Sequence, residues 1–304
     1  MRQLLREHAV DPAAVEATGP GGRITRADVE RHIRATGATA ITAPVGGAPP
    51  APAPAPAPAT TEGGAPARPP TVVPFTNIRR RTAEHMALSK QTSPHAYSVI
   101  EVDYENVERV RRTVRDTWKA EEGFSLTYLP FIARAVIDAL EEFPHLNATV
   151  GADELVVEPA VHLGIAVDLD FEGLLAPVVR DAESKRLRAI AREIVDLSGR
   201  ARTKRLSIDE ITGGTFTITN NGSFGTAIVL PIINQPQVGI LSTDAITRKP
   251  VVVIDGDGGE AIAIHSVGML ALAWDHRAFD GSYAGAFLSH VKQILETRDW
   301  AAEL

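Results

Sequence analysis

An Ala-Pro tract from Ala48 to Ala59 constrains this chain most, because it separates two parts that must fold independently. Proline fixes φ and the tract offers no large side chain to bury, so it favours an extended spacer of roughly 3 Å per residue. We assign residues 37–70 to this linker, with a small unit at residues 1–36 and a main domain at residues 71–304. A ligand for a proline-binding domain is disfavoured, since Ala-Pro alternation lacks the side chains that give such ligands specificity.

The composition of the 304 residues excludes several classes of protein. No apolar run approaches the roughly 18–20 residues of a membrane span, and the first residues lack the pattern of a signal peptide. Without cysteine the chain forms no disulfide and no thiolate metal site, and we expect no metal. A net charge of −7 argues against general nucleic-acid binding. We therefore expect a soluble cytoplasmic protein with no nucleic-acid or membrane partner.

The small unit reads as two short helices around a glycine-rich loop. Leu4–His8 is helical in character, and Gly19–Arg23 is a loop by composition. Thr25 followed three residues later by Asp28 predicts a helix N-terminus, with the helix running to Ile33. A unit of this size is near the lower limit for independent folding. It therefore suits a docking module better than an enzyme.

The main domain alternates strand and helix patterns. We predict strands at residues 97–102, 155–157, 163–167, 175–179, 215–219, 239–241, 251–254 and 267–274, and helices at residues 104–118, 129–143, 187–202 and 284–296. The acidic, glycine-rich stretch 255–260 is expected to be a hairpin loop. The pattern predicts an α/β (α+β) fold in which helices cover one side of a mixed β-sheet, beside a small all-α N-terminal domain.

One histidine stands where a strand is expected to end. The apolar run Val267–Trp274 is typical of a buried strand, and it delivers His276 to its end. Asp280 follows four residues later, and Gly281 permits a tight turn. A histidine held by a rigid strand beside carboxylates is a candidate general base. The alternative is a structural histidine whose ring is satisfied by hydrogen bonds in the core.

A second candidate is the polar turn that follows the strand at residues 215–219. Thr219 and Asn220 lie where a hydroxyl and an amide can point out of the sheet. The alternative is ordinary turn chemistry, since Asn-Gly and Ser are turn residues. The stretch is not a Walker motif, because no Gly-Lys-Ser/Thr follows it.

These motifs resemble those of the dihydrolipoamide acyltransferases, the acyltransferase components of 2-oxo acid dehydrogenase complexes. Asp275-His276-Arg277-x-x-Asp280-Gly281 resembles the histidine motif of that family. Its other blocks are similar to residues 126–131, 143–148, 163–168 and 214–220, in the same order. Residues 1–36 resemble its peripheral-subunit-binding domain through Val10-Asp11 and Gly19–Ile24. The resemblance implies a chloramphenicol-acetyltransferase-like catalytic core.

The resemblance also implies a reaction, transfer of an acyl group from dihydrolipoamide to CoA. His276 would take the proton from the CoA thiol, whose ordinary pKa of about 8.5 leaves little thiolate at neutral pH. The Thr219 hydroxyl would donate a hydrogen bond to the oxyanion of the tetrahedral intermediate. Asp280 would order the histidine and its neighbours. Asp275 and Arg277 are expected to form a structural ion pair that shapes the loop.

Further binding residues follow from the family motifs. Candidate CoA contacts are Thr127, Asp168, Ser198, Asn220 and Ser223. For Thr127 and Ser198 the alternative is a hydrogen bond to the backbone. In the small unit, Arg2, Arg6 and Arg23 match arginines that grip acidic residues of dihydrolipoamide dehydrogenase or of the 2-oxo acid decarboxylase. The alternative is that these three arginines are simply solvated.

The resemblance further implies a homotrimer, in which the histidine of one subunit faces the hydroxyl donor of its neighbour. Trimers of the family can assemble into a 24-mer or larger shell through an apolar carboxyl end, for which Trp300 and Leu304 are candidates. The lipoyl group is carried on a lysine of an Asp-Lys turn, and no lysine of this chain follows an aspartate. We therefore expect the lipoyl group to come from elsewhere.

Two other functions stay open from the sequence. A non-catalytic scaffold is disfavoured, because such relatives tend to lose the histidine motif. An acetyltransferase that acts on a small alcohol is disfavoured by the docking module and the linker. Among acyl groups, we favour those of pyruvate or branched-chain complexes, because no extra basic residue near His276 suggests a succinyl carboxylate.

Overall fold

The computed structural model describes residues 10–19, 22, 24–36, 70–254 and 256–304. The chain divides into two compact units, Met1–Thr71 and Val72–Leu304. The predicted helix at residues 4–8 lies outside the described residues, as does most of the predicted loop at residues 19–23.

The small unit contains the 3₁₀ helix η1 (Pro12–Ala14) and the helix α2 (Arg26–Thr36). At the start of α2, the Thr25 amide donates to Asp28 Oδ2 over 2.8 Å and the Asp28 amide donates to Thr25 Oγ1 over 3.4 Å. The predicted helix start is therefore confirmed, and the helix runs three residues beyond Ile33. Asp28 is buried, and hydrogen bonds from the Thr18 side chain and from the Thr25 and Thr18 amides hold its pKa well below the ordinary value.

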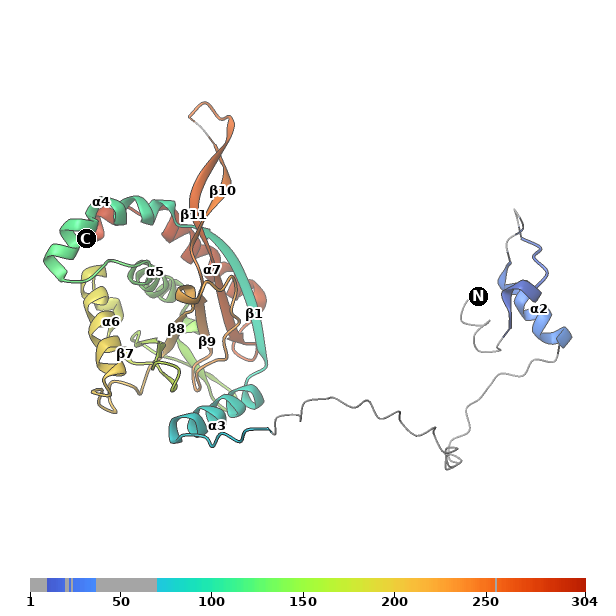
Figure 1. Ribbon diagram of the computed structural model, residues 1–304, viewed down its shortest axis with the longest axis horizontal. Helices are drawn as coiled ribbons and strands as arrows, with labels where there is room; N and C mark the ends of the chain where they lie inside the picture. The colour runs from blue at the N-terminus through green and yellow to red at the C-terminus, as the bar shows by residue number, and fades with distance from the viewer. Residues whose placement is uncertain (1–9, 20–21, 23, 37–69, 255) are drawn as a thin grey trace, which may run out of the picture. The chain divides into compact units, whose positions relative to one another are not determined.

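The main unit is built on a mixed sheet (Figure 1), as predicted. Its strands are β1 (His95–Asp103), β11 (Glu260–Asp275), β9 (Gly239–Thr243), β8 (Phe216–Asn220), β4 (Leu163–Ile165) and β7 (Val178–Val179), in that spatial order. β8 runs parallel to β4 and β9, and the remaining neighbours are antiparallel. Two small sheets pair β2 (Ala148–Val150) with β3 (Leu155–Val157) and β5 (Val167–Asp168) with β6 (Leu174–Leu175).

Two predicted strands are each divided in the structure. The strand predicted at residues 163–167 becomes β4 and β5, and that at 175–179 becomes β6 and β7. Pro177 stands at the second break, where its missing amide hydrogen removes one bond from the ladder. The prediction of single strands was therefore wrong at these two places, although both segments are extended.

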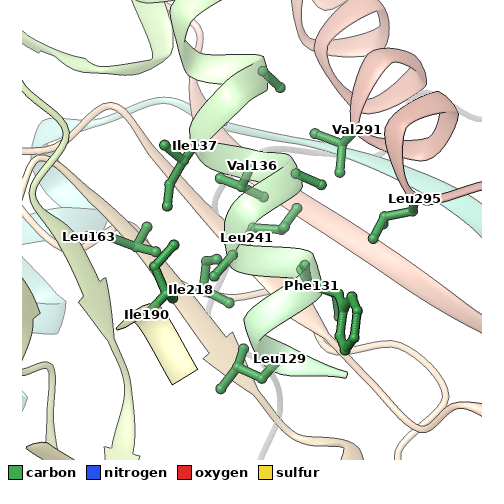
Figure 2. Packing of buried hydrophobic residues seen from close by; sticks show 14 of the residues in the cluster. Leu129, Phe131, Val136, Ile137, Leu163, Ile190, Ile218, Leu241, Val291 and Leu295 are labelled. Carbon is green, nitrogen blue, oxygen red and sulfur yellow. The ribbon is translucent and has the colours of Figure 1, made fainter. Parts of the chain in front are cut away.

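Four helices build the core with the sheet: α4 (Glu105–Glu122), α5 (Leu129–Glu142), α6 (Leu187–Arg202) and α7 (Gly281–Thr297). Figure 2 shows Val136 and Ile137 of α5 packed with Leu163, Ile218 and Leu241 of the sheet. Because side chains alternate along a strand, burial of Ile218 on this face directs its neighbours Thr217 and Thr219 to the opposite face. The four predicted helices are confirmed.

The helix α3 (Asn77–Thr92) was not predicted, because its sequence is polar over most of its surface and only Ser89 is fully buried. Four short 3₁₀ helices complete the unit: η2 (Pro144–Leu146), η3 (Ala182–Ser184), η4 (Gly222–Phe224) and η5 (Trp300–Glu303). Trp300 is fully buried and packs against Phe131 with ring centroids 5.2 Å apart. Of the two candidates for a joining plug, Trp300 is thus part of the core of its own chain.

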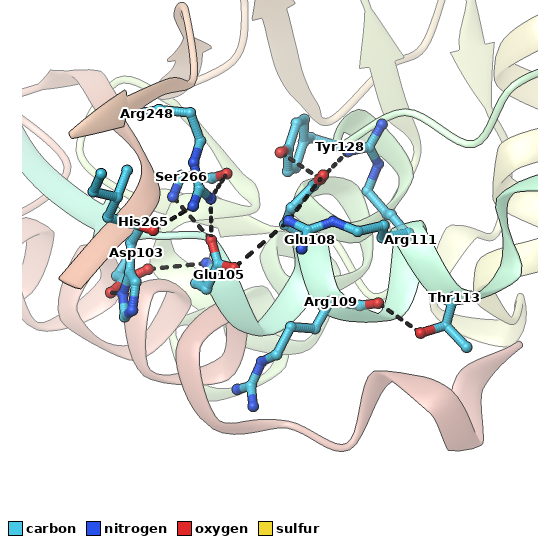
Figure 3. A network of polar contacts seen from close by, with 12 residues as sticks. Asp103, Glu105, Glu108, Arg109, Arg111, Thr113, Tyr128, Arg248, His265 and Ser266 are labelled. Carbon is cyan, nitrogen blue, oxygen red and sulfur yellow. Dashed lines mark hydrogen bonds and ion pairs between the residues drawn. The ribbon is translucent and has the colours of Figure 1, made fainter. Parts of the chain in front are cut away.

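A long hairpin of β10 (Thr247–Ile254) and the outer half of β11 projects from the sheet (Figure 1). The predicted hairpin loop is confirmed, since β10 ends at Ile254 and β11 begins at Glu260. At the base, His265 Nδ1 lies 2.5 Å from Asp103 Oδ2, and Arg248 pairs with Glu105 (Figure 3). Four exposed side chains on one face of the hairpin are apolar, Val252, Ile254, Ile262 and Ile264, and the exposed Glu260 lies opposite Ile254 on the same face. In the described residues, no helix is both long enough and apolar enough to cross a membrane.

Candidate active site

His276 directly follows Asp275, the last residue of β11, and so lies at the end of an interior strand. Its amide donates to the Pro94 carbonyl over 3.1 Å, which fixes the backbone just past the strand. Its ring lies against the buried Trp274, with centroids 4.6 Å apart, and 52% of its side chain is exposed. Asp280 Oδ1 is 3.7 Å from His276 Nδ1, close enough for electrostatic attraction but too long for a hydrogen bond. The ring is thus held in place while about half of the side chain stays exposed.

A second histidine shows what a satisfied ring looks like in this fold. His95 lies opposite Asp275 in the β1–β11 ladder. Its Nδ1 is 2.8 Å from the Ser93 carbonyl, and its Nε2 accepts from the Ile233 amide over 3.0 Å. Burial lowers the pKa of His95, so its neutral form is favoured. The structural alternative raised for His276 therefore describes His95, because no ring nitrogen of His276 has a hydrogen-bond partner within the described part of the chain.

The predicted ion pair between Asp275 and Arg277 is confirmed. Arg277 Nη2 and Nε lie 2.6 Å and 3.0 Å from the two carboxylate oxygens of Asp275, and the Arg277 amide also donates to Asp275. Asp275 is 1% exposed. Burial alone would raise the pKa of Asp275, but hydrogen bonds from Arg277 and Ser93 outweigh it and lower that pKa. This pair of a buried carboxylate with a partly exposed arginine shapes the loop from which His276 projects.

Thr219 is the fourth residue of β8 and is half-buried. Its side chain lines a cavity of about 370 Å³ on the sheet face opposite Ile218, which we call the Thr219 cavity. Thr217 and Asn221 line the same cavity, together with aliphatic side chains from α3, β6, β9 and the segment before β9. Thr219 therefore lines a partly open, mainly apolar space.

Asn220, the next residue, points to a different space. It lines a cavity of about 220 Å³ together with Thr127 and Ser223, which we call the Asn220 cavity. Three of the five predicted CoA contacts thus meet in one place. Asp168 and Ser198 do not line it among the residues that the structure describes. Asp168 instead accepts the Phe171 amide at the β5–β6 turn, and Ser198 is a half-buried residue of α6.

The sequence analysis missed Asp244, a 2% exposed carboxylate that also lines the Asn220 cavity. It accepts hydrogen bonds from Thr226 Oγ1 over 2.6 Å, from Ser242 Oγ over 3.2 Å and from the Val229 amide over 3.1 Å. Ser242 in turn accepts from Asn221 Nδ2 over 3.1 Å. Asp244 therefore anchors the turn that follows Thr219 and Asn220. The signal was a lone aspartate at the end of an apolar strand.

His276 and Thr219 lie near opposite ends of β9, at the ends of the neighbouring strands β11 and β8. Thr219 is paired with Ser242 of β9, whereas Asp275 of the antiparallel β11 bonds the Val238 carbonyl at the other end of β9. Asp275 and Thr219 are therefore separated by four residues along β9 and by two strand spacings, which amounts to roughly 16 Å. Within one chain, therefore, the candidate base and the candidate oxyanion donor do not reach the same atom.

The partner-binding candidates Arg2, Arg6 and Arg23 lie outside the described residues.

Comparison with known proteins shows the family to which the chain belongs. A model of the 2-oxoacid dehydrogenases acyltransferase catalytic domain matches residues 67–302, and an E3-binding domain model matches residues 2–30. The lipoamide acyltransferase component of the branched-chain alpha-keto acid dehydrogenase complex of Bacillus subtilis is 37% identical over 98% of this chain and 70% of its own length. The dihydrolipoyllysine-residue acetyltransferase component of the pyruvate dehydrogenase complex of Mycobacterium bovis is 40% identical over 100% of this chain, but only 55% of its own length is covered.

Among solved structures, the dihydrolipoamide acetyltransferase of Azotobacter vinelandii is 30% identical and has a TM-score of 0.70. The match covers 78% of this chain and 99% of that one. The predicted family is therefore confirmed: this chain belongs to the acyltransferases of the 2-oxoacid dehydrogenases and carries the family's catalytic domain.

Proposed function

We propose that this chain transfers an acyl group from S-acyl-dihydrolipoamide to CoA, as the core of a 2-oxo acid dehydrogenase complex. Membership of the acyltransferase family supports the reaction class. The names of the two relatives support acyl groups of the branched-chain or the pyruvate type. The observation that carries the proposal is a half-exposed, rigidly placed His276 together with the half-buried Thr219.

In this reaction His276 accepts the proton of the CoA thiol, and the thiolate attacks the carbonyl carbon of the acyl group. The carbonyl oxygen gains negative charge and takes a hydrogen bond from Thr219, a contribution of about 10²–10³ in rate. The intermediate then expels the dihydrolipoamide sulfur, which recovers the proton from the His276 imidazolium. The proton taken from the CoA thiol is returned to the dihydrolipoamide sulfur, so the reaction needs no further reactant.

The Asn220 cavity is our candidate for the uncharged part of CoA. Amide, hydroxyl and carboxylate groups line it, and its described lining contains no lysine or arginine. Such groups suit the amides and hydroxyl of a pantetheine chain better than its phosphates. The lipoyl group would arrive on a lipoyl domain outside these 304 residues.

We infer that the complete site lies between two copies of the chain. The roughly 16 Å between Asp275, next to His276, and Thr219 leads us to infer that the base of one copy serves the hydroxyl of the next. A head-to-tail contact forms a ring when its rotation closes, and a homotrimer is the ring that we propose, with further assembly into a 24-mer or larger shell. The exposed apolar face of the β10–β11 hairpin suits burial in that contact.

The match of residues 2–30 to an E3-binding domain indicates assembly with other components of a multienzyme complex. We propose dihydrolipoamide dehydrogenase and the 2-oxo acid decarboxylase as these partners, held through Arg2, Arg6 and Arg23. A cytoplasmic location belongs to the same proposal.

The test is CoA acylation measured on size-separated assemblies. We expect transfer from S-acyl-dihydrolipoamide in the oligomer and none after dilution to the monomer. Full activity in the monomer would contradict the two-copy site. An oligomer that transfers no acyl group would favour the scaffold instead.

A further inference from the structure

Asp244 is a buried carboxylate that has no role in the proton transfers proposed above. It directly follows β9 and is 2% exposed. It accepts hydrogen bonds from three places in the chain, the Thr226 hydroxyl over 2.6 Å, the Val229 amide over 3.1 Å and the Ser242 hydroxyl over 3.2 Å. Burial of a carboxylate costs free energy that such donors at most offset, so the packing of the core does not by itself explain an aspartate here.

The carboxylate fixes the direction of a short chain of hydrogen bonds. An ionised carboxylate only accepts, so the Ser242 hydroxyl gives its single proton to Asp244. The Ser242 oxygen is then left as an acceptor, and Asn221 Nδ2 donates to it over 3.1 Å. The side-chain amide of Asn221 is therefore held in one of its two orientations. Ser242 and Asp244 are both buried within one chain, so these bonds do not depend on a second copy.

The main chain around Asp244 holds the same turn. The Asn221 amide donates to the Thr243 carbonyl over 2.9 Å. A Cβ added to Gly222 would lie 2.8 Å from the Asp244 carbonyl oxygen, so the turn packs directly against the backbone of Asp244. The turn at residues 220–222 is thus tied to the end of β9 through both side chains and main chain.

We propose that Asp244 is a positioning residue for acyl transfer, which acts on Thr219 through Ser242 and the turn. The inference rests on the proposed function, in which the Thr219 hydroxyl donates to the oxyanion. Thr219 comes directly before the turn and pairs with Ser242 in the β8–β9 ladder, so a shift of the turn displaces its hydroxyl. A misplacement of about 1 Å costs on the order of 10² in rate. The loss cannot exceed the whole contribution of the hydroxyl.

The experiment measures CoA acylation by the full chain in its oligomer. Asp244→Ala leaves the Ser242 hydroxyl and the Val229 amide without an acceptor, and we expect kcat to fall about thirtyfold. Ser242→Ala breaks only the link to Asn221, and we expect a fall of about tenfold. Because Ser242 does not line the Asn220 cavity in the described part of the chain, KM for CoA in Ser242→Ala should stay within about twofold of the parent value.

The conservative variant Asp244→Asn should restore most of kcat. Its side-chain oxygen accepts from Ser242 and Val229 as before, and its nitrogen donates to Thr226 Oγ1. The Thr226 hydroxyl then gives its own proton to the Asn221 carbonyl, which lies 3.0 Å away. If Asp244→Asn is as damaging as Asp244→Ala, charge rather than hydrogen bonding is the function of this residue, and the inference is overturned.

The same variants in a Thr219→Ala background separate positioning from a general weakening of the fold. Without the hydroxyl nothing is left to position, so Asp244→Ala and Ser242→Ala should each change the remaining kcat by less than about twofold. An equal loss in both backgrounds overturns the inference, and so does an unchanged kcat when Thr219 is intact. Should Asp244→Ala fail to fold, Ser242→Ala decides by the same criteria.

Thr215→Val is the matched control, because it also removes a buried hydroxyl. Thr215 Oγ1 accepts the His162 amide over 2.9 Å, just before β8 and at the far end of that strand from Thr219. We expect kcat within about twofold of the parent, since the turn at residues 220–222 is untouched. A fall as large as that of Ser242→Ala would attribute both losses to stability and contradict the inference. A parent chain that transfers no acyl group fails the proposed function, whereas an active parent with unaffected variants overturns this inference alone.

Discussion

The ends of β11 and β8 present their candidate catalytic groups in opposite ways. At the end of β11 the His276 ring protrudes, half exposed, beside the pair of the buried Asp275 with Arg277. At the end of β8 the half-buried Thr219 lines a mainly apolar hollow. The two groups lie too far apart to act on one atom within one chain. This difference supports our proposal that the chemistry belongs to a contact between two copies of the chain.

Removal of the protruding base should have the largest effect. We expect His276→Ala to lower kcat by about 10³, because general acid–base catalysis contributes 10²–10⁴, with little change in KM for CoA. Steady-state CoA acylation measures this loss. His265→Ala is the matched control, since that ring is paired with Asp103 at the hairpin base, far along β11 from His276. A His276→Ala enzyme within threefold of the parent kcat would remove the histidine from the mechanism.

Removal of the half-buried donor should have the next largest effect. Thr219→Ala is expected to lower kcat by about 10²–10³, the contribution of one oxyanion donor. Thr219→Ser keeps the hydroxyl and should retain most of the rate. If serine proved as damaging as alanine in the same assay, packing against the cavity rather than hydrogen bonding would be the function of Thr219.

The ion pair beneath His276 should affect stability more than chemistry. Arg277→Gln leaves the buried Asp275 carboxylate without its cation, and we expect a loss of about 2 kcal/mol, a value reduced because Arg277 is partly exposed. The pKa of Asp275 is lowered in the folded state. Its contribution is therefore present above the unfolded pKa of about 3.9 and is lost as pH falls below that value.

Urea unfolding at pH 7 and pH 3 checks this prediction for both proteins. The gap in unfolding free energy between the parent and Arg277→Gln should narrow in acid, because the unfolded chain takes up a proton at Asp275 below about pH 3.9 whereas the folded parent, with its lowered pKa, resists it. An equal gap at both pH values would show that the ionised pair is not its source.

The smallest effect is expected at Asp280. This carboxylate is 85% exposed and 3.7 Å from the His276 ring, so its attraction to the imidazolium is screened by water. We expect Asp280→Ala to lower kcat only about threefold, and Asp280→Asn to lower it less. A loss comparable to that of His276→Ala would mean that Asp280 takes a direct part in the reaction.

Much of the catalytic domain could be predicted because its signals are local. The apolar run before His276 predicted the inner part of β11, and helical periodicity predicted α5 and α6. The helix α3 escaped because it buries little, and Pro177 divided a strand that hydrophobicity alone made continuous. The family motifs named five candidate CoA contacts, of which Thr127, Asn220 and Ser223 share one cavity, whereas Asp168 and Ser198 do not line it in the described part of the chain. Membership of a cavity depends on contacts distant in sequence, which is also why Asp244 was missed.

The most direct test of the two-copy site mixes two defective proteins. His276→Ala and Thr219→Ala chains are each nearly inactive alone, and they are mixed in equal amounts and allowed to exchange subunits. If the base of one chain serves the hydroxyl of the next, about a quarter of the contacts carry both intact groups, by random pairing in a ring. We therefore predict recovery of about a quarter of the parent kcat for CoA acylation. An exchanged mixture no more active than its two components would contradict the account, because base and donor would then have to come from the same chain.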